Sequence, residues 1–157
     1  MNRGKSLDDR KRQCFTRRMP WVKGASIKSA AELVQEHLHY MTTDLTKWRA
    51  LFNENAIWEF AYGPSAGVSG TARGIVEIAQ RVEGFLARVD GLSYDDLKIH
   101  QIDRVDAVFA EFQGRAKVTG TGRHYHQNYV VYLCAEDGKI VFGREYFDPT
   151  RVVAAFS

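Results

Sequence analysis

The sequence predicts an α+β fold in which helices cover one face of a curved, antiparallel sheet. Apolar residues recur at helical spacing in the first part of the chain, strand-like segments dominate after Gly91, and an Asp-Gly pair near the end marks a tight hairpin. A run of helices followed by a run of strands is typical of this class. A sheet wrapped around a long N-terminal helix would give a cone-shaped domain with an internal pocket.

Three helices are expected from the apolar spacing. Ser26 is the candidate N-cap of the first, whose apolar stripe continues to Met41. Thr43 or Asp44 is expected to cap a shorter second helix. Gly74 opens the third, which carries an apolar stripe of its own.

Aromatic and β-branched segments predict the strands. A first strand is expected at 56–62, and a glycine-rich turn separates it from a short extended piece at 68–71. Four longer strands are expected at 92–102, 107–119, 123–135 and 140–147. Pro149 ends the last of them, and 152–156 is expected to form a final helical turn.

The chain of 157 residues has the length of one domain, predicted at 26–157, preceded by a basic arm at 1–25. The net charge is +3, but residues 1–28 alone carry nine Lys or Arg and two Asp. A basic arm can contact nucleic acid or an anionic membrane. We favour a plain terminal extension, because the body offers no basic groove, and we expect neither nucleic-acid nor membrane binding.

Cysteine usage and hydropathy set the expected environment. Cys14 and Cys134 cannot form a disulfide framework or a cysteine-based metal site. The sequence has no apolar run long enough to span a bilayer and no secretory signal at its start. A cytoplasmic location is therefore expected.

The Asp137-Gly138 hairpin allows the faces of its two strands to be predicted. A two-residue turn pairs Glu136 with Lys139 and places Glu145 opposite Val130. Because side chains alternate between faces, this register puts Glu145 on one face with three polar residues of the preceding strand. These residues are His124, His126 and Asn128. A β-bulge in one strand would exchange its faces.

An acid, an amide and an imidazole on one face are what proton transfer in a small pocket requires. Glu145 is the candidate general acid or base, His126 its partner, and Asn128 a hydrogen-bond donor to a carbonyl group. Two alternatives remain open. Glu145 could form an ion pair with Arg123, Arg144 or Arg151, or it could bind a metal together with His124 and His126, although we expect no metal.

Aromatic residues are the expected walls of a substrate pocket, since apolar ligands are usually held in this way. The candidates are Tyr40, Trp48, Trp58, Phe60 and Phe147. The other face of the hairpin is apolar enough for a homodimer interface on the outside of the sheet. The residues expected there are Tyr125, Tyr129, Val131, Leu133 and Phe142.

The chain resembles the SnoaL-like branch of the nuclear transport factor 2-like superfamily over residues 26–156. The branch is related to the steroid isomerases, the polyketide cyclases and the phenazine-biosynthesis A/B proteins. The resemblance rests on the element order and on LFNENAIWEF at 51–60, Gly70, Gly74-Ile75, DGKI at 137–140 and REYFDP at 144–149. It implies a cofactor-free enzyme or a binder of small hydrophobic molecules, a homodimer, and a pocket inside the cone.

When single positions are compared, the resemblance supports Glu145 as an active-site residue. Glu145 falls where the phenazine proteins have an active-site glutamate. The general base of the steroid isomerases falls at Phe60, and their oxyanion-hole aspartate falls at Val130. Neither can do that chemistry, so steroid isomerisation by that mechanism is not expected.

Two functions are therefore expected as alternatives. The first is a cofactor-free isomerase, cyclase, dehydratase or hydrolase that acts on a small, largely apolar molecule through Glu145. The second is a noncatalytic module of the same fold that binds a small ligand or a partner. Fold analogy alone does not choose between them.

Overall fold

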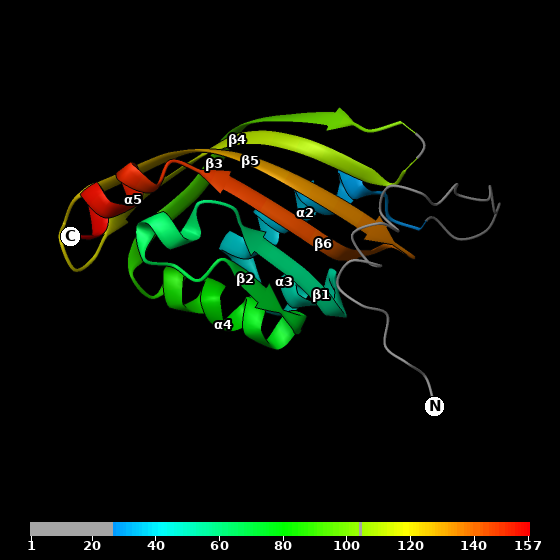
Figure 1. Ribbon diagram of the computed structural model, residues 1–157, viewed down its shortest axis with the longest axis horizontal. Helices are drawn as coiled ribbons and strands as arrows, with labels where there is room; N and C mark the ends of the chain where they lie inside the picture. Colours follow the sequence, from blue (N-terminus) through cyan, green and yellow to red (C-terminus); the bar gives the residue numbers. More distant parts are fainter. Residues whose placement is uncertain (1–26, 104) are drawn as a thin grey trace.

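The structure is a computed structural model and describes residues 27–103 and 105–157 (Figure 1). Its helices are α2 (Ala30–Thr43), α3 (Leu45–Ala50), the short 3-10 helix η1 (Gly63–Ala66), α4 (Gly74–Leu86) and α5 (Pro149–Phe156). Its strands are β1 (Phe52–Phe60), β2 (Thr71–Arg73), β3 (Val89–Gln101), β4 (Ala107–Val118), β5 (His124–Glu136) and β6 (Lys139–Phe147). The predicted basic arm lies outside the described residues.

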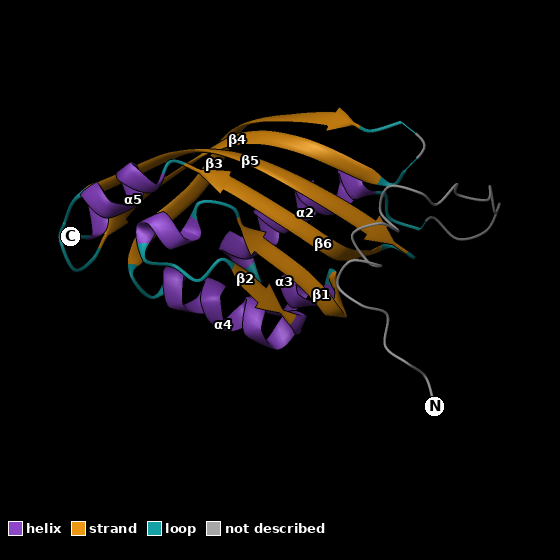
Figure 2. Ribbon diagram, viewed as in Figure 1, coloured by secondary structure: helices purple, strands orange, loops and turns teal. Residues whose placement is uncertain are grey.

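One curved sheet holds all six of these strands in the order β2-β1-β6-β5-β4-β3 (Figure 2). The α+β class is confirmed, but the sheet is mixed because β1 and β6 run parallel. The chain leaves β1 through η1, β2 and α4, builds β3 to β5 as a meander, and returns with β6 beside β1 in the same direction. The other neighbouring pairs are antiparallel.

Helix α2 begins three residues later than the sequence analysis expected. Ser29 accepts a hydrogen bond from the backbone N–H of Glu32 at 3.3 Å, and the Glu32 carboxylate accepts one from the Ser29 N–H at 2.8 Å. This reciprocal capping box fixes the start of the helix. Asp106 also accepts a hydrogen bond from the Ala30 N–H at 2.8 Å, which ties the helix to the turn before β4. Ser26 lies outside the described residues.

The inner face of the sheet is the one covered by helices, with α2 lying behind the strands in Figure 1. Leu33, Val34 and Leu38 of α2 belong to the same buried cluster as residues of the central strands. Those strand residues include Val108, Ala110, Val131 and Leu133. Helix α4 packs against β1 and β2 and closes the other side of this core.

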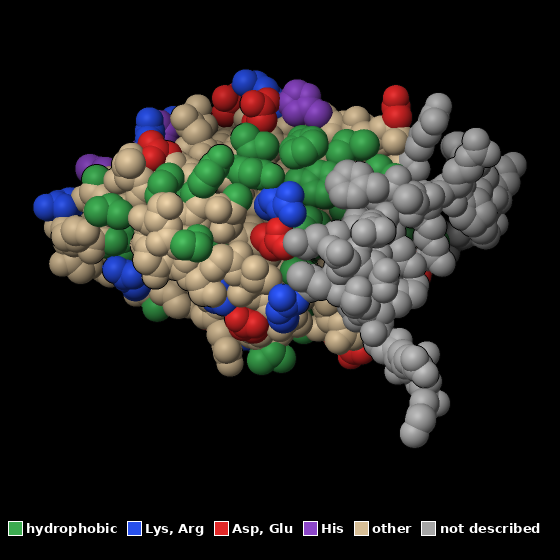
Figure 3. Space-filling view, viewed as in Figure 1, with side chains coloured by type: hydrophobic (Ala, Val, Ile, Leu, Met, Phe, Trp, Pro, Cys, Tyr) green, Lys and Arg blue, Asp and Glu red, His purple; other side chains and the backbone are tan. Residues whose placement is uncertain are grey.

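A band of hydrophobic side chains crosses the outer face of the sheet (Figure 3). The strand registers place Phe109, Val130, Tyr132, Phe142 and Tyr146 on it. Of the residues expected at a dimer interface, only Phe142 lies here; the other four expected there point into the core. A homodimer through this face stays a prediction. In the part of the chain described, no helix is long and apolar enough to cross a membrane.

Candidate active site

A β-bulge in the hairpin decides which side chains share a face with Glu145. Glu136 pairs with Lys139 as predicted, and Ala135 pairs with Ile140. The register then shifts, so that Cys134 pairs with Phe142. From this point on, every pair is displaced by one residue, because the bulged strand contains one residue more than its partner. Glu145 therefore lies opposite Val131 and points to the inner face.

The predicted grouping of Glu145 with His126 and Asn128 is wrong for this reason. His126 and Asn128 are exposed on the outer face, where the ring nitrogen Nε2 of His126 lies 3.2 Å from the amide oxygen of Gln113. His124 lies on the same outer face, so the three-residue metal site is excluded as well. Within residues 27–103 and 105–157, no group of three potential metal-binding side chains is present.

Glu145 lies in an apolar place on the inner face and is only partly accessible to solvent. Burial raises the pKa of its carboxyl group from 4.5 to about 7, and a hydrogen bond from the Trp58 side chain lowers it in part. Phe60 is its neighbour across the β1–β6 pair, and Val131 across the β5–β6 pair. The carboxyl group thus exchanges its proton near neutral pH.

The predicted ion pairs of Glu145 are not formed. Arg144 donates to the Glu59 carboxylate at 2.8 Å on the outer face. Arg123 and Arg151 donate to backbone carbonyl oxygens. Among the described residues, no lysine or arginine forms an ion pair with Glu145. A carboxylate that has been taken out of water without a cation is the usual origin of a raised pKa.

Three tyrosines, Tyr94, Tyr125 and Tyr129, lie on the inner face of the sheet near Glu145. The hydroxyl oxygens of Tyr125 and Tyr129 are 2.6 Å apart, and the hydroxyl group of Tyr94 contacts the sulfur atom of Met41 at 3.8 Å. Burial raises the pKa of all three hydroxyl groups, to about 12 for Tyr125, and the negative charge of Glu145 raises each of them further. These phenols therefore remain neutral hydrogen-bond donors when Glu145 is ionised.

Gly114 allows two of these rings to lie against the sheet. A Cβ atom at this position would stand 2.8 Å from Cε2 of Tyr129 and 3.2 Å from Cε1 of Tyr94. The centroids of these two rings are 6.4 Å apart in an edge-to-face arrangement. A larger residue at position 114 would displace the two rings that form this side of the site.

The five predicted pocket aromatics have different places. Trp58, Phe60 and Phe147 lie on the inner face near Glu145 and Tyr129, and Phe147 is buried. Trp48 is buried beneath them, where its indole N–H donates to Nδ1 of His37 at 3.0 Å. Tyr40 is half-buried, and the ammonium group of Lys47 lies 5.7 Å from its ring centroid. Their role as substrate-binding residues stays a prediction.

The three tyrosines were not predicted as site residues, because the bulge reverses the faces of the hairpin strands. An uninterrupted hairpin would place Tyr125 and Tyr129 on the outer face, and no sequence pattern gave a role to Tyr94. One signal was present in the sequence: Gly114 and Gly143 both interrupt strands, and glycine inside a strand often marks a close approach of another group. In the structure, both glycines accommodate an aromatic ring.

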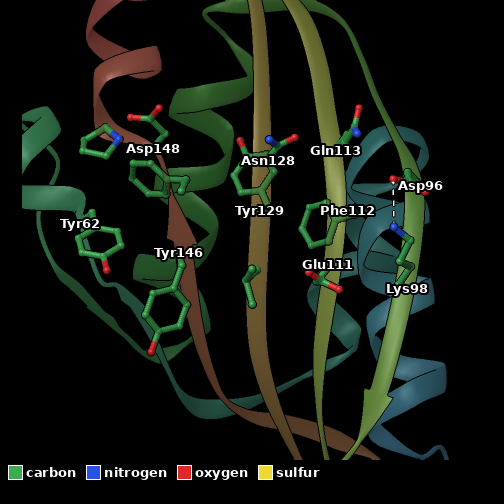
Figure 4. A pocket seen from close by; sticks show the side chains of 13 residues that line it. Tyr62, Asp96, Lys98, Glu111, Phe112, Gln113, Asn128, Tyr129, Tyr146 and Asp148 are labelled. Atoms are coloured by element: carbon green, nitrogen blue, oxygen red, sulfur yellow. Dashed lines mark ion pairs between the residues drawn. The ribbon is translucent and has the colours of Figure 1, made fainter.

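A separate cavity of about 720 Å³ opens on the outer face (Figure 4). It extends from Tyr62 and Tyr146 to the ion pair between Lys98 and Asp96, whose charged atoms are 3.6 Å apart, and Asn128 lines its middle. Most of its lining residues, among them Glu111 and Tyr146, lie on the face of the sheet opposite Glu145, but Phe112, Tyr129 and Phe147 of the inner face line it as well. Glu145 itself does not line this cavity. The pocket expected inside the cone stays a prediction.

Comparisons with known proteins agree with this fold. The model of the SnoaL-like domain family matches residues 34–142. The uncharacterized protein YesE of Bacillus subtilis is 30% identical over 130 residues, which is 82% of this chain and 88% of YesE.

Solved protein structures with a similar fold agree with this family match. A Bacillus subtilis protein proposed to be an isomerase is 31% identical, with a TM-score of 0.75 over 81% of this chain and 91% of that one. A Catenulispora acidiphila protein with a ketosteroid isomerase-like fold, solved in complex with trimethylamine, is 16% identical, with a TM-score of 0.67 over 81% of this chain and 93% of that one. This second likeness shows the fold alone. The match of the family model and the identity to YesE together show that the chain belongs to the SnoaL-like domain family.

Proposed function

We propose that the protein is a cofactor-independent enzyme in which Glu145 moves a proton next to a carbonyl group of a small, largely apolar molecule. One observation carries this proposal. Glu145 forms no ion pair with any residue that the structure describes, its pKa is raised to about 7 by burial, and it lies on the same face as three neutral tyrosine hydroxyl groups.

The protonation state of Glu145 suits a general base that must also return its proton. The best pKa for such a group lies near the operating pH, since both forms are then populated. A carboxyl group with an ordinary pKa would be a weaker base at neutral pH and would be slow to return the proton. The burial that raises the pKa of Glu145 therefore has a direct chemical use.

The tyrosines supply the complementary group. In the contact between Tyr125 and Tyr129 one hydroxyl donates and the other accepts, so the accepting hydroxyl keeps its own hydrogen atom for a third partner. The Tyr94 hydroxyl contacts only the weak acceptor sulfur of Met41 among the described residues. Such donors stabilise the negative charge that develops on a carbonyl oxygen when the neighbouring carbon loses a proton.

The proposed step balances without a cofactor. The Glu145 carboxylate takes a proton from the carbon next to the carbonyl, and the C–H electron pair forms the carbon–carbon double bond of an enolate. A tyrosine hydroxyl stabilises the enolate oxygen. Return of the proton to a different carbon gives an isomer. Alternatively, the enolate carbon attacks a second carbonyl group of the same molecule and closes a ring, and the alkoxide that forms takes the proton back from Glu145.

The surroundings of Glu145 favour an uncharged substrate. Trp58 and Phe60 offer apolar surface, and ionised Glu145 would repel an anion. The nearby guanidinium group of Arg81 is occupied by the carbonyl oxygens of Ser69 and Thr71 and by the Glu77 carboxylate. It is therefore not free to bind a substrate carboxylate.

Hydrogen–deuterium exchange tests this proposal without knowledge of the natural substrate. A panel of cyclic ketones, aryl ketones, enones and lactones is incubated with the protein in D₂O, and loss of the C–H signal next to the carbonyl is followed by NMR. We expect faster exchange for at least one class and a loss of about 100-fold or more in Glu145→Gln. Glu111→Gln, which changes an exposed carboxylate on the outer face, is the matched control. Equal rates for wild type and Glu145→Gln, or no exchange of any class, would reject the proposal.

The alternative is ligand binding without catalysis. An ionised carboxylate framed by aromatic rings also suits a small organic cation, and the Catenulispora acidiphila protein of the same fold was solved with trimethylamine. In this case trimethylammonium should bind more tightly as the pH rises through 7, because Glu145 must be ionised. Calorimetry at pH 6 and pH 8 would show that gain, and Glu145→Gln would abolish it, while no compound of the panel would exchange.

A further inference from the structure

The Trp58 indole lies flat against the strand that carries Glu145. Trp58 pairs with Gly143 across the β1–β6 pair, two residues before Glu145 on the same face. A Cβ atom on Gly143 would stand 2.2 Å from Cε3 and 2.3 Å from Cζ3 of the indole. No side chain fits beneath the ring, so this orientation of Trp58 requires glycine at position 143.

The other side of the indole is covered by His37. The two rings are stacked, with centroids 5.0 Å apart and an angle of 19° between their planes. His37 is buried, and burial lowers its pKa to about 4, so its ring is neutral at physiological pH. Nδ1 of His37 accepts the hydrogen bond from Trp48, which leaves Nε2 as the protonated ring nitrogen.

We propose that Trp58 is the positioning residue for Glu145: its indole, clamped between Gly143 and His37, donates the hydrogen bond that orients the carboxylate. The importance of this hydrogen bond for catalysis rests on the proposed function, in which Glu145 is the base. The hydrogen bond gives Trp58 a task different from the pocket wall that the sequence suggested.

The groups around Glu145 determine which of its protonation states is favoured. The titratable side chains near Glu145 among the described residues are Tyr94, Tyr125 and Tyr129, whose pKa values burial and the charge of Glu145 raise, so all three stay neutral while Glu145 titrates. An indole N–H donates but cannot accept, so it favours the ionised carboxylate over the carboxylic acid. Trp58 therefore both orients the base and keeps burial from raising its pKa further.

NMR of the intact protein tests the inference directly. The indole N–H resonances of Trp48 and Trp58 are followed from pH 5 to pH 9, together with the carboxyl carbon of Glu145 in protein labelled with ¹³C-glutamate. We expect the Trp58 resonance to shift with the same midpoint as Glu145, and to stop shifting in Glu145→Gln. The Trp48 resonance is the internal control and should not follow Glu145, because its partner is His37. A Trp58 resonance that stays fixed while Glu145 titrates would overturn the inference.

Two matched substitutions provide a second readout. Trp58→Phe removes the donor and should raise the midpoint of Glu145 by about one pH unit, as expected for loss of a hydrogen bond to a charged group. Trp48→Phe makes the same change at a similarly buried site and should leave that midpoint in place. An equal rise in both variants would reject the inference. A common midpoint near 4.5 for Trp58 and Glu145 would instead retain the contact and reject the proposed function.

Discussion

Val131 lies directly opposite Glu145 across the β5–β6 pair, so both side chains point into the core side of the sheet. This pairing differs by one residue from that of an uninterrupted hairpin, in which Val130 would be the partner. The difference moves the carboxyl group from the outer face, where His126 and Asn128 are exposed, to the buried inner face. It thereby places Glu145 with tyrosines rather than with histidines and gives it a pKa of about 7.

The first prediction concerns the residues on the outer face. His126→Ala and Asn128→Ala should leave any exchange activity that depends on Glu145 within about twofold of wild type, since exposed substitutions usually cost less than about 0.5 kcal/mol. The NMR exchange assay measures this effect. A loss of 100-fold in either variant would return both residues to the active site and contradict the observed register.

The second prediction concerns how the free energy of unfolding depends on pH. The two buried groups His37 and Glu145 change it in opposite directions. The native pKa of His37 is lowered to about 4, so its contribution to stability is lost as the pH falls below 6.5. The native pKa of Glu145 is raised to about 7, so stability is lost as the pH rises from 4.5 to 7. Between pH 4.5 and 6.5 the two contributions should nearly cancel in the wild type.

Glu145→Gln separates the two effects. Its free energy of unfolding should rise by about 2 kcal/mol as the pH rises from 4.5 to 6.5, because only the His37 contribution remains. At pH 8 it should be more stable than the wild type, which must ionise a buried carboxyl group. Urea unfolding at several pH values provides the measurement, with Glu54→Gln as the exposed control on β1. A variant that is less stable than wild type at pH 8 would assign Glu145 a structural role.

The third prediction concerns the buried hydroxyl pair. Tyr125→Phe and Tyr129→Phe should each destabilise the fold by about 1–2 kcal/mol, because each leaves the other buried hydroxyl without this partner. The double variant should cost less than the two single variants together, by about 1 kcal/mol. Strictly additive losses in urea unfolding would mean that the two hydroxyl groups do not interact.

The fourth prediction concerns Gly143. Gly143→Ala should destabilise the protein by about 1–3 kcal/mol, since the added Cβ would overlap the Trp58 ring. Gly84→Ala is the matched control, because no atom outside its own helix lies within 4 Å of an added Cβ there. That change should stabilise α4 by about 0.5–1 kcal/mol. Thermal unfolding distinguishes the two, and a neutral Gly143→Ala would disprove the close contact.

The sequence allowed the order and type of the elements to be predicted, because the hydrophobic period changes from helical to alternating where the fold does. Asp44, Gly74 and the Asp137-Gly138 turn lie where they were expected. The start of α2 was misplaced, although Glu32 three residues after Ser29 completes a recognisable capping box. A second serine at position 26 fitted the same helical period and obscured that signal.

The face of Glu145 was harder to predict, because both faces of the hairpin mix polar and apolar residues. One extra residue near Val141 reverses the alternation, and nothing in the pattern from Ile140 to Phe142 marks the bulge. The parallel pairing of β1 with β6 was missed for a related reason. It depends on how distant strands meet, which local periodicity does not encode.

The pH dependence of carbon–hydrogen exchange tests the central claim, the role of Glu145 as a base, most directly. For a compound that the wild type exchanges, the rate should rise with pH, reach half of its plateau near pH 7 and fall by about 100-fold or more at every pH in Glu145→Gln. A profile with a midpoint near 4.5, or one that Glu145→Gln leaves unchanged, would show that this carboxyl group is not the base.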